Sequence, residues 1–493
     1  MKIERRKIGK ALIFAVFFAM LIFVSVGCAS AATHYVNPGE SIQAVVTAAN
    51  AGDTIIVRDG TYTENIDINK RLTIQSENGS ASTIAQAANP DDHVFEVTAD
   101  YVNISGFTVE GANEYETPAP AGIYLYYVNY CNIFDNNLSN NYNGIRLFGS
   151  GNNKLANNTA LNNKDSGILL EDTSDNNLVM NNNLKNNYLG ICLRCWGADN
   201  NTIVNNNIES NYRCGMTIAC SINNVITNNN IKDNHYAGVH FYSSNNTIRN
   251  NNISNNWHYA ITFSHRSDDN IYLNNFINNN DVYDEYGDSS YTWNSPEEIT
   301  YTYNGSEFEN YLGNYWDDYV FAGNDTDGDG IGDTPYSIDS DKDNYPLVEE
   351  FENYIAPPPE GLLNVPFFSQ RDPAWSDKKL DHSPYSIGEY GCALTSAAMV
   401  SKYFGYDTDP DRLNTSLTEV GGLDTSGILH WKKVEEVSDG KVEWVGWGEG
   451  SWSRIDQELS EKNPVIANVS CPLGTHFIVF IGKVGDGHYL VQI

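Results

Sequence analysis

Two residues in the last quarter of the chain have the types and contexts needed for covalent catalysis. Cys392 stands directly before the run Ala393–Val400, whose apolar spacing predicts a helix over residues 393–404. A thiol at the start of a helix is favoured as the thiolate, because the helix dipole and the free backbone N–H groups stabilise negative charge. His476 lies in the alternating stretch Thr475–Gly482, which predicts a strand. A cysteine nucleophile on a helix start and a histidine base on a distant strand can together perform acyl transfer.

An aspartate-rich segment, Asp325–Asp333, offers a second kind of chemistry. Carboxylates at alternate positions with glycines between them suit a hard cation, so the segment predicts a structural calcium ion. The twelfth position of an EF-hand count is Tyr336 rather than a glutamate, so the loop is not an EF-hand and needs further ligands from outside it. An acidic turn without an ion explains the same composition. The candidate ligands are Asp325, Asp327, Asp329 and Asp333.

A repeat occupies the middle of the chain, from about Cys131 to Tyr286. Each period opens with an Asn-Asn pair, or a near match, and contains two stretches in which apolar and polar residues alternate. Alternation predicts strands, and the Asn/Gly clusters between them predict turns. A leucine-rich repeat is excluded, because its leucine framework is absent. The second residues of the pairs are Asn132, Asn153, Asn177, Asn201, Asn224, Asn246 and Asn270, at intervals of 21 to 24 residues.

We therefore predict an all-β solenoid, a right-handed parallel β-helix in which each period is one coil. Stacked coils lie about 4.8 Å apart, so asparagines at one position can form an internal ladder of amide hydrogen bonds. Upstream, residues 41–50 predict an amphipathic helix that caps the exposed N-terminal end of the solenoid. The first strands are expected at Thr54–Val57, Leu72–Ile74, Val94–Val97 and Val102–Ile104.

One face of the coils carries residues that suit a glycan. In the strand after each turn, the alternation places aromatic and charged side chains outward on a flat parallel surface. Sugar rings pack on aromatic rings while polar side chains bond their hydroxyls, although aromatics that only cover the sheet give the same pattern. No acid pair stands out on this face, which disfavours cleavage of the sugar. The predicted ligand-binding residues are Tyr142, Arg146, Tyr188, Arg194, Tyr236, His240 and Tyr242.

The start of the chain predicts export. Residues 1–31 combine a basic start, an apolar run and Ala29-Ser30-Ala31, which is typical of a cleaved signal peptide; an uncleaved anchor is the alternative. No later segment is apolar enough to cross a membrane, so we expect a secreted or cell-surface protein without a transmembrane span in its mature chain. The formal net charge of −34 argues against binding of nucleic acid.

Four cysteines, at positions 192, 195, 214 and 220, interrupt the coils. Cys195 and Cys220 occupy the same column of neighbouring coils, so their separation suits a disulfide in an exported protein. A zinc site is the alternative, but the spacing is not that of a zinc ribbon or finger.

A proline-rich stretch, Ala356–Gly361, ends the repeat region, and ordinary composition follows it. The predicted organisation is a signal peptide over residues 1–31, a β-helix with an acidic C-terminal segment over 32–350, a linker over 351–362 and a smaller domain over 363–493.

The first part of the chain resembles NosD-type exported proteins. The resemblance rests on Gly52–Val57 with Gly60-Thr61-Tyr62, on the Asn-rich coils, on Asn314–Tyr319 and on the acidic segment with Thr334-Pro335-Tyr336. It covers about residues 34–350 and implies the carbohydrate-binding and sugar-hydrolase (CASH) β-helix. It does not specify an activity, because binders, adhesins, lyases and hydrolases share that fold.

The last part, about residues 363–493, resembles the bacteriocin-processing (double-glycine) cysteine peptidase-like family. The resemblance rests on Val365–Gln370, Tyr390–Val400 and Thr475–Gly482. It implies an α+β papain-like domain in which Cys392 is the nucleophile, His476 its general base and Gln370 the residue that stabilises the oxyanion, with no cofactor required.

One position departs from that family. An Asp or Asn is expected on the strand after His476 to orient its imidazole, and loss of such a residue costs a triad about 10⁴ in rate. The last hairpin is expected to turn at Gly485–Gly487, which puts the position opposite His476 beyond Ile493. Gln492 is an unusual substitute. We therefore expect either a domain truncated at its C-terminus or a weakened peptidase.

Together these features predict an exported surface protein whose solenoid binds a glycan or another surface polymer and whose C-terminal domain hydrolyses peptide bonds. A non-catalytic binding or adhesion protein with a degenerate peptidase domain is the first alternative. A β-helix polysaccharide lyase or hydrolase is the second.

Overall fold

The structure is a computed structural model. It describes residues 32–114, 119–194, 196–242, 245–264, 268–279, 282–285, 291–319, 325–338, 341–354, 363, 365–370, 372, 374–438, 440–443, 451–471, 474–483 and 489–492. The predicted signal peptide and Cys195 lie outside these residues.

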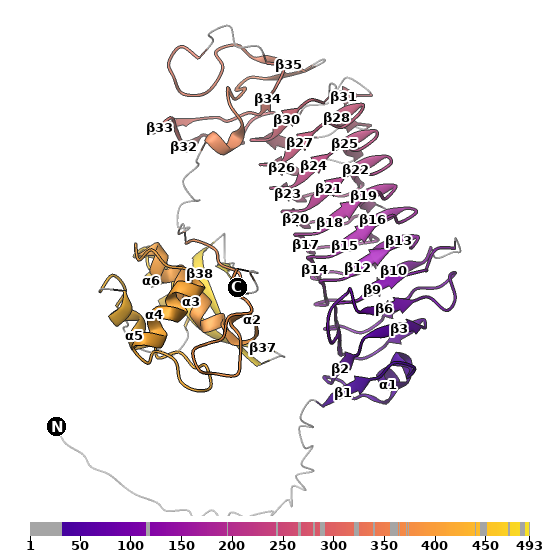
Figure 1. Ribbon diagram of the computed structural model, residues 1–493. Helices are drawn as coiled ribbons and strands as arrows, with labels where there is room; N and C mark the ends of the chain where they lie inside the picture. The colour runs from indigo at the N-terminus through magenta and orange to yellow at the C-terminus, as the bar shows by residue number, and fades with distance from the viewer. Residues whose placement is uncertain are drawn as a thin grey trace, which may run out of the picture.

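The larger part of the chain winds into a parallel β-helix with three sheets, as predicted (Figure 1). Sheet A consists of β1 (Thr33–Val36), β2 (Thr54–Val57), β5 (Thr73–Ser76), β8 (Asn103–Ser105), β11 (Asn132–Phe134), β14 (Lys154–Ala156), β17 (Leu178–Met180), β20 (Thr202–Val204), β23 (Val225–Thr227), β26 (Thr247–Arg249) and β29 (Asn270–Tyr272). Sheet B consists of β3 (Gly60–Thr63), β6 (Thr83–Gln86), β9 (Thr108–Glu110), β12 (Asn137–Ser139), β15 (Thr159–Leu161), β18 (Asn183–Lys185), β21 (Asn207–Glu209), β24 (Asn230–Lys232), β27 (Asn252–Ser254), β30 (Asn275–Ile277) and β34 (Tyr315–Trp316).

Sheet C has the longest strands and forms the third side. It consists of β4 (Ile66–Ile68), β7 (Phe95–Val97), β10 (Ala121–Tyr126), β13 (Asn143–Phe148), β16 (Ser166–Glu171), β19 (Leu189–Arg194), β22 (Cys214–Ala219), β25 (Ala237–Tyr242), β28 (Tyr259–Phe263) and β31 (Tyr283–Asp284). Inward-facing Ile, Val, Leu and Phe side chains of all three sheets form one continuous buried core. Each coil is thus held to the next by backbone pairing and by a shared apolar interior.

Asparagine pairs build the corners of the coils. The first member of a pair, such as Asn157 or Asn181, has a positive φ near 56°, a left-handed conformation that Asn tolerates better than most residues. The second member is buried and bonds to its equivalents in the coils on either side. Asn158, for example, donates from its backbone N to Asn182 Oδ1 at 2.9 Å, and its own Oδ1 accepts from Asn136 N at 3.1 Å. The predicted amide ladder is confirmed.

Three such ladders run along the solenoid, one at each corner. Within a coil the ladder residues follow at intervals of five, as in Asn153, Asn158 and Asn163, so the sides that hold sheets A and B keep one length. The third side, from Asn163 to Asn177, spans 14 residues, and the next comparable sides span 12 to 14. In these regular coils the variation in length therefore falls on the side that carries sheet C. In the first predicted pair the ladder residue is Cys131, and in the last it is Asp269. Asn132 and Asn270, which were predicted at these positions, lie in strands instead.

The predicted N-terminal helix is present as α1 (Ile42–Ala48). Ser41 caps its start, and the carboxylate of Glu64 accepts from the backbone N–H groups of Ile42 and Gln43 at 2.8 and 3.1 Å. These contacts satisfy donors that have no partner inside the helix. The buried side chains of Ile42 and Val46 pack α1 on the first coil, where it contacts β1, β2 and β4.

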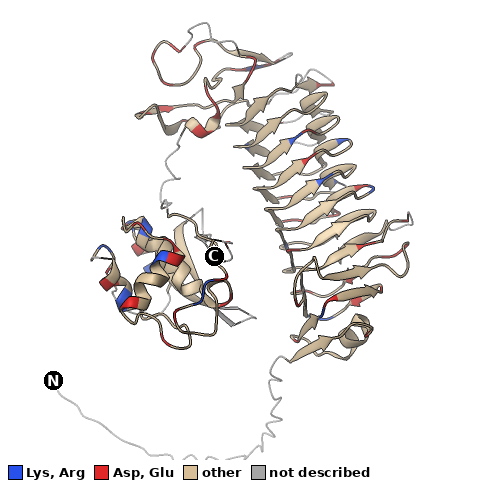
Figure 2. Ribbon diagram, in the orientation of Figure 1, with Lys and Arg blue, Asp and Glu red and all other residues tan. Residues whose placement is uncertain are grey.

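An extension follows the last coils. It contains the hairpins β32 (Ile299–Tyr303)–β33 (Ser306–Asn310) and β35 (Tyr336–Ile338)–β36 (Asp341–Asp343), and the 3₁₀ helix Phe351–Asn353. A cluster of buried aromatics, among them Tyr301 and Tyr354, forms its own small core. Packed structure thus continues four residues past 350, into the stretch predicted as linker. Figure 2 shows acidic residues on this extension.

The C-terminal region is an α+β domain. It contains α2 (Ile387–Tyr390), α3 (Cys392–Tyr403), α4 (Pro410–Glu419), α5 (Trp431–Val437), α6 (Trp452–Ser460) and an antiparallel sheet of β37 (Val465–Cys471), β38 (Gly474–Lys483) and β39 (Tyr489–Gln492). Helix α3 is central, because its Leu394 and Ala398 pack with α4 and α5 while Met399 and Val400 pack against β38.

Candidate functional site

Cys392 is the first residue of α3, one residue earlier than the predicted start of that helix. Gly391 precedes it as the N-cap and links α3 to the single turn of α2. The thiol is partly exposed, whereas the following residues 394–401 are buried. The local structure therefore presents one sulfur at the positive end of a twelve-residue helix whose body is fixed in the core.

Gln370 lies close to the same turn. Its side-chain amide donates to the backbone oxygen of Gly388 at 3.0 Å, and Gly388 is four residues before Cys392. This contact places Gln370 near the start of α3, and its role in stabilising an oxyanion stays a prediction.

His476 lies on β38, the strand that contacts α3. It is half-buried and stands opposite Val469 of β37. On the other edge, the pairs Val479–Gln492 and Phe480–Val491 confirm the predicted register of the last hairpin. Asp486 and the other turn residues lie outside the described residues.

The outer face of sheet C carries two columns of side chains in register. The first column contains Glu96, Tyr124, Arg146, Leu169, Cys192, Thr217, His240 and Thr262; the second contains Tyr126, Phe148, Glu171, Arg194, Ala219 and Tyr242. Of the residues predicted to bind a ligand, Arg146 and His240 thus share one column, and Arg194 and Tyr242 share the other.

The seven predicted residues form a strip rather than one site. Tyr142, Tyr188 and Tyr236 lie in the turns that lead into β13, β19 and β25. Arg146 and His240 are four strands apart, which corresponds to about 19 Å at the usual strand spacing. Tyr188 and Tyr242 are exposed, whereas Arg146 is buried and His240 donates to or accepts from Thr262 Oγ1 at 2.6 Å.

Glu171 forms ion pairs with both predicted arginines, and Arg194 also pairs with Asp165 at 3.6 Å. The Oε1 atom of Glu171 lies 2.6 Å from Nε and from Nη2 of Arg146, and its Oε2 atom lies 3.5 Å from Nε of Arg194. Arg146 also donates through Nη1 to the backbone oxygen of Ala119 at 2.8 Å. The guanidinium of Arg146 is therefore held in place and its charge is compensated.

A hollow of about 350 Å³ opens next to Arg146, within the size range of small-molecule sites. Sequence reasoning missed most of it, because His93 and Glu96 belong to a coil that precedes the regular asparagine repeat. The hollow is lined by Asp92, His93, Glu96, Tyr124, Tyr126, Arg146 and Phe148. The alternation of Glu96 with buried Phe95 and Val97, which matches that of Tyr124 with Ile123 and Leu125, is the signal that could have aligned the two coils.

Aromatic stacking holds the floor of the hollow rigid. The Tyr124 ring lies between the His93 ring, at 4.1 Å and 19° between planes, and the Arg146 guanidinium, at 5.0 Å. His93 Nδ1 accepts from the backbone N–H of Ala121 at 3.0 Å, which assigns the ring proton to Nε2. Burial, and then the charge of Arg146, lower the pKa of His93 to about 3, so the imidazole is neutral at physiological pH.

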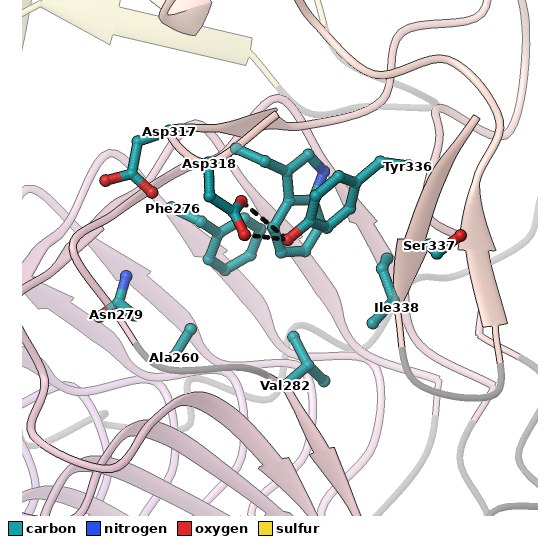
Figure 3. A pocket seen from close by; sticks show the side chains of 10 residues that line it. Ala260, Phe276, Asn279, Val282, Asp317, Asp318, Tyr336, Ser337 and Ile338 are labelled. Atoms are coloured by element: carbon teal, nitrogen blue, oxygen red, sulfur yellow. Dashed lines mark hydrogen bonds between the residues drawn. The ribbon is translucent and has the colours of Figure 1, made fainter. Parts of the chain in front are cut away.

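A second, smaller hollow lies at the end of the solenoid (Figure 3). Phe276, Trp316 and Tyr336 stack along one side at centroid distances of 4.3 and 4.5 Å, and the Tyr336 hydroxyl donates to the carboxylate of Asp318. Its volume of about 40 Å³ is close to that of one water molecule, so it is too small for a sugar ring.

Three of the four predicted calcium ligands come together. Asp325, Asp327 and Asp329 bring carboxylate oxygens within 4.8 Å of one another. Asp333 is not part of this group; its Oδ2 accepts from the backbone N and the hydroxyl of Thr326 instead. Asp325 also accepts from the backbone N–H groups of Gly328 and Gly330, which shapes the loop.

The structure describes three of the four cysteines that interrupt the coils. Cys192 and Cys214 are buried on the outer side of sheet C, and Cys220 is exposed after β22. Leu193 pairs with Ile218 on the neighbouring strands β19 and β22. Since Cys195 lies outside the described residues, the disulfide stays a prediction.

Comparison with known proteins agrees with this two-part architecture. The model of the right-handed β-helix region matches residues 49–221, 121–282 and 192–310, which together make up more than half of the chain. The model of the Peptidase_C39-like family matches residues 362–491. The part of the chain that the structure describes contains no helix long and apolar enough to cross a membrane.

Individual relatives match parts of the chain. A cell surface glycoprotein of Methanothermus fervidus is 39% identical over 89 residues, which are 18% of this chain and 13% of that protein. The A-module of mannuronan C-5 epimerase AlgE6 from Azotobacter vinelandii aligns with 51% of this chain and 92% of its own, at 15% identity and a TM-score of 0.36. An alginate lyase from Paenibacillus aligns with 53% of this chain and 98% of its own, at 14% identity and a TM-score of 0.36.

Proposed function

Because the chain belongs to the family of right-handed β-helix proteins and ends in a Peptidase_C39-like domain, we propose that it is a two-part protein of the cell surface. Its solenoid binds a glycan on the outer face of sheet C, and its C-terminal domain hydrolyses peptide bonds. The predicted signal peptide and the similarity to a cell surface glycoprotein support the location. The similarity covers only 13% of that relative, so support for the glycan and for the peptide substrate comes from this chain's own residues.

The peptidase activity is supported above all by the position of Cys392 at the N-terminus of α3, a helix that packs on the strand carrying His476. In the reaction the Cys392 thiolate attacks the carbonyl carbon of the peptide and forms a tetrahedral oxyanion. The imidazolium of His476 gives its proton to the leaving amine, and a thioester remains on the sulfur. Water activated by His476 then hydrolyses the thioester.

The oxyanion needs donors close to Cys392. The backbone N–H at the start of α3 supplies one, and the amide of Gln370, held near Gly388, supplies the second. A residue that orients the imidazole would keep one of its ring nitrogens directed at the sulfur.

Alkylation of Cys392 as a function of pH tests this assignment. Iodoacetamide labelling of the full chain is followed by peptide mapping, so that Cys392 is measured apart from the other cysteines. We expect fast labelling near pH 6 that is lost in His476→Ala and kept in His382→Ala, whose histidine is exposed in the same domain. Labelling that only rises near pH 8.5 and ignores both substitutions would contradict the peptidase and leave a binding protein with a degenerate domain.

The glycan-binding face is supported by exposed aromatics beside paired charges on one flat sheet. Tyr126, Tyr188 and Tyr242 are each more than 40% exposed, an arrangement on which sugar rings can stack. A glycan array with the full chain tests this part, and Tyr188→Ala and Tyr242→Ala are expected to reduce the signal.

A further inference from the structure

The hollow beside Arg146 contains polar groups that the protein itself does not satisfy. Among the described residues, no hydrogen-bond partner is found for Nε2 of His93, for the hydroxyl of Tyr124 or for the carboxylate of Glu96. His93 is 5% and Tyr124 is 4% exposed, and neither side chain has a polar atom among the fully buried unpaired ones, so the small accessible parts of both residues include these polar atoms, at the hollow. A ligand that displaces water from the hollow must supply matching groups for them, which points to a ligand rich in hydroxyls.

These groups offer the complement of sugar hydroxyls. Neutral His93 donates through Nε2–H, Glu96 accepts, and the Tyr124 hydroxyl does either. On the open side, Tyr126 and Phe148 provide apolar ring surface with centroids 5.8 Å apart. A pyranose has the same two-sided character, with C–H groups on its faces and hydroxyls at its rim.

The charges around the hollow select against acidic sugars. Asp92 and Glu96 line it, and Asp67 stands opposite Glu96 on the neighbouring strand β4. Arg146 is the one cation among the residues that line the hollow, and its Nε, Nη1 and Nη2 atoms are already bonded to Glu171 and to Ala119 O. The carboxylate of a uronate would face this negative charge, and the one cation of the lining is already paired with Glu171.

The chain enlarges its third side at this hollow. The ladder-equivalent positions Ala112 and Cys131 are 19 residues apart, against 12 to 14 in the regular coils that follow. Ala119, which holds Nη1 of Arg146, belongs to this longer segment. The coil that carries Tyr124 and Tyr126 is thus the one in which the outer face departs most from the repeat.

We infer that this hollow is the subsite for one uncharged sugar residue and that it makes the solenoid selective for neutral glycans over polyuronates. The inference rests on the glycan binding proposed above. The ring stacks on Tyr126 and Phe148, while its hydroxyls bond Glu96, Tyr124 and Nε2 of His93.

The test compares neutral hexose and N-acetylhexosamine oligosaccharides with oligouronates of equal length, on an array and then by calorimetry with the full chain. We expect neutral oligosaccharides to bind at least tenfold more tightly. Tyr126→Ala is expected to weaken that binding at least tenfold, whereas Tyr35→Ala, an equally exposed tyrosine on sheet A, leaves it unchanged. Glu96→Gln removes a negative charge, so we expect it to improve oligouronate binding. The preference for neutral oligosaccharides over oligouronates should then be smaller.

The failures of the two proposals are distinguishable. If neutral glycans bind and Tyr126→Ala does not weaken their binding, while Tyr242→Ala does, the subsite is wrong and the glycan-binding face stands. If oligouronates bind as tightly as neutral glycans, the selectivity is wrong. If no oligosaccharide of either class binds, both the subsite and the glycan-binding face are overturned.

Discussion

Arg146 and Glu171 lie on adjacent strands of sheet C, with the Nε and Nη2 atoms of the arginine both 2.6 Å from one carboxylate oxygen, and both side chains are at most 10% exposed. Ion pairs this deeply buried are costly to break from one side, because the remaining charge loses its partner without regaining water.

Glu171 keeps a weaker contact with Arg194 at 3.5 Å, so we expect Arg146→Met to lower the free energy of unfolding by about 3 kcal/mol, the lower end for such pairs. The double variant Arg146→Met, Glu171→Leu should recover a large part of this loss, since it removes the buried carboxylate and leaves Arg194 with Asp165. Urea denaturation followed by circular dichroism measures both. A double variant no more stable than Arg146→Met would show that the pair does not account for the effect.

The amide ladder should be sensitive to a single deletion. The side chain of Asn206 accepts from Asn182 N and Nδ2 at 2.9 and 3.0 Å and donates to Val179 O at 2.9 Å and to Asn229 Oδ1 at 3.0 Å. Asn206→Ala leaves several of these groups buried and unpaired, at about 1 to 3 kcal/mol for each. We expect a loss of at least about 3 kcal/mol, measured by urea denaturation.

The neighbouring Asn205 is a matched control. It is exposed and has a φ of 56°, which glycine adopts without strain. Asn205→Gly should therefore change stability by less than about 1 kcal/mol. Equal losses of stability in Asn206→Ala and Asn205→Gly would show that the second asparagine of the pair does not have the special role proposed for it.

Asp343 predicts a pH dependence of the extension. Its side chain is fully buried, and burial raises its pKa from 3.8 to about 6 despite bonds from Asn314 N, Trp316 Nε1 and Tyr345 N. The folded state thus holds a proton that the unfolded state has released between these values. The stability that the protonated carboxyl confers is full below about pH 4 and is lost as the pH rises through 6, by about 3 kcal/mol in total.

Asp343→Asn should lack this decline, although its amide loses one accepting oxygen and lowers stability at every pH. Urea midpoints of both proteins at pH 4, 5, 6 and 7 measure the difference. Parallel curves for the two proteins would mean that Asp343 does not titrate in this range.

The expected calcium site is testable through Asp327. Its carboxylate lies in the group with Asp325 and Asp329, and the pKa of Asp329 is raised by burial first and then by the neighbouring Asp327 and Asp325 charges. A divalent ion would relieve this repulsion, so millimolar CaCl₂ should raise the thermal midpoint. We expect Asp327→Asn to abolish the increase and Asp333→Asn, outside the group, to keep it. A wild-type midpoint that calcium leaves unchanged would favour the ion-free acidic turn.

The regular coils could be predicted from sequence, because the second asparagine of each pair repeats at nearly constant intervals and the strands between them alternate. The role of the first asparagine could not, since a positive φ leaves no periodic signature distinct from that of its neighbour. At two ladder positions the residue is Cys131 or Asp269 rather than asparagine, and there the predicted ladder residue is wrong by one position.

The site was predicted unevenly for the same reason. Cys392 and His476 stand in local contexts, a helix start and an alternating strand, that are readable without alignment. His93 and Glu96 join Tyr124 and Arg146 only through coils of 29 and 22 residues, lengths that a search for a constant period does not superimpose. The pairing of Arg146 with Glu171 could not be predicted, because it joins two different columns of sheet C through residues that are 25 positions apart in the chain.

In the regular coils, the sides that hold sheets A and B keep a constant length of five residues. The scaffold can therefore stay the same while the outer face of sheet C changes. A residue gained or lost between Asn163 and Asn177 shifts no ladder and no strand of sheets A or B, so selection can lengthen, shorten or redecorate that side while the interior is copied unchanged. The last coil differs from the regular coils, because its β32–β33 hairpin lies between Thr292, which pairs with Asn270 of sheet A, and the ladder residue Asn314. Insertions on the side of sheet C can thus add new surface residues one coil at a time, while the ladders and the core keep the protein folded.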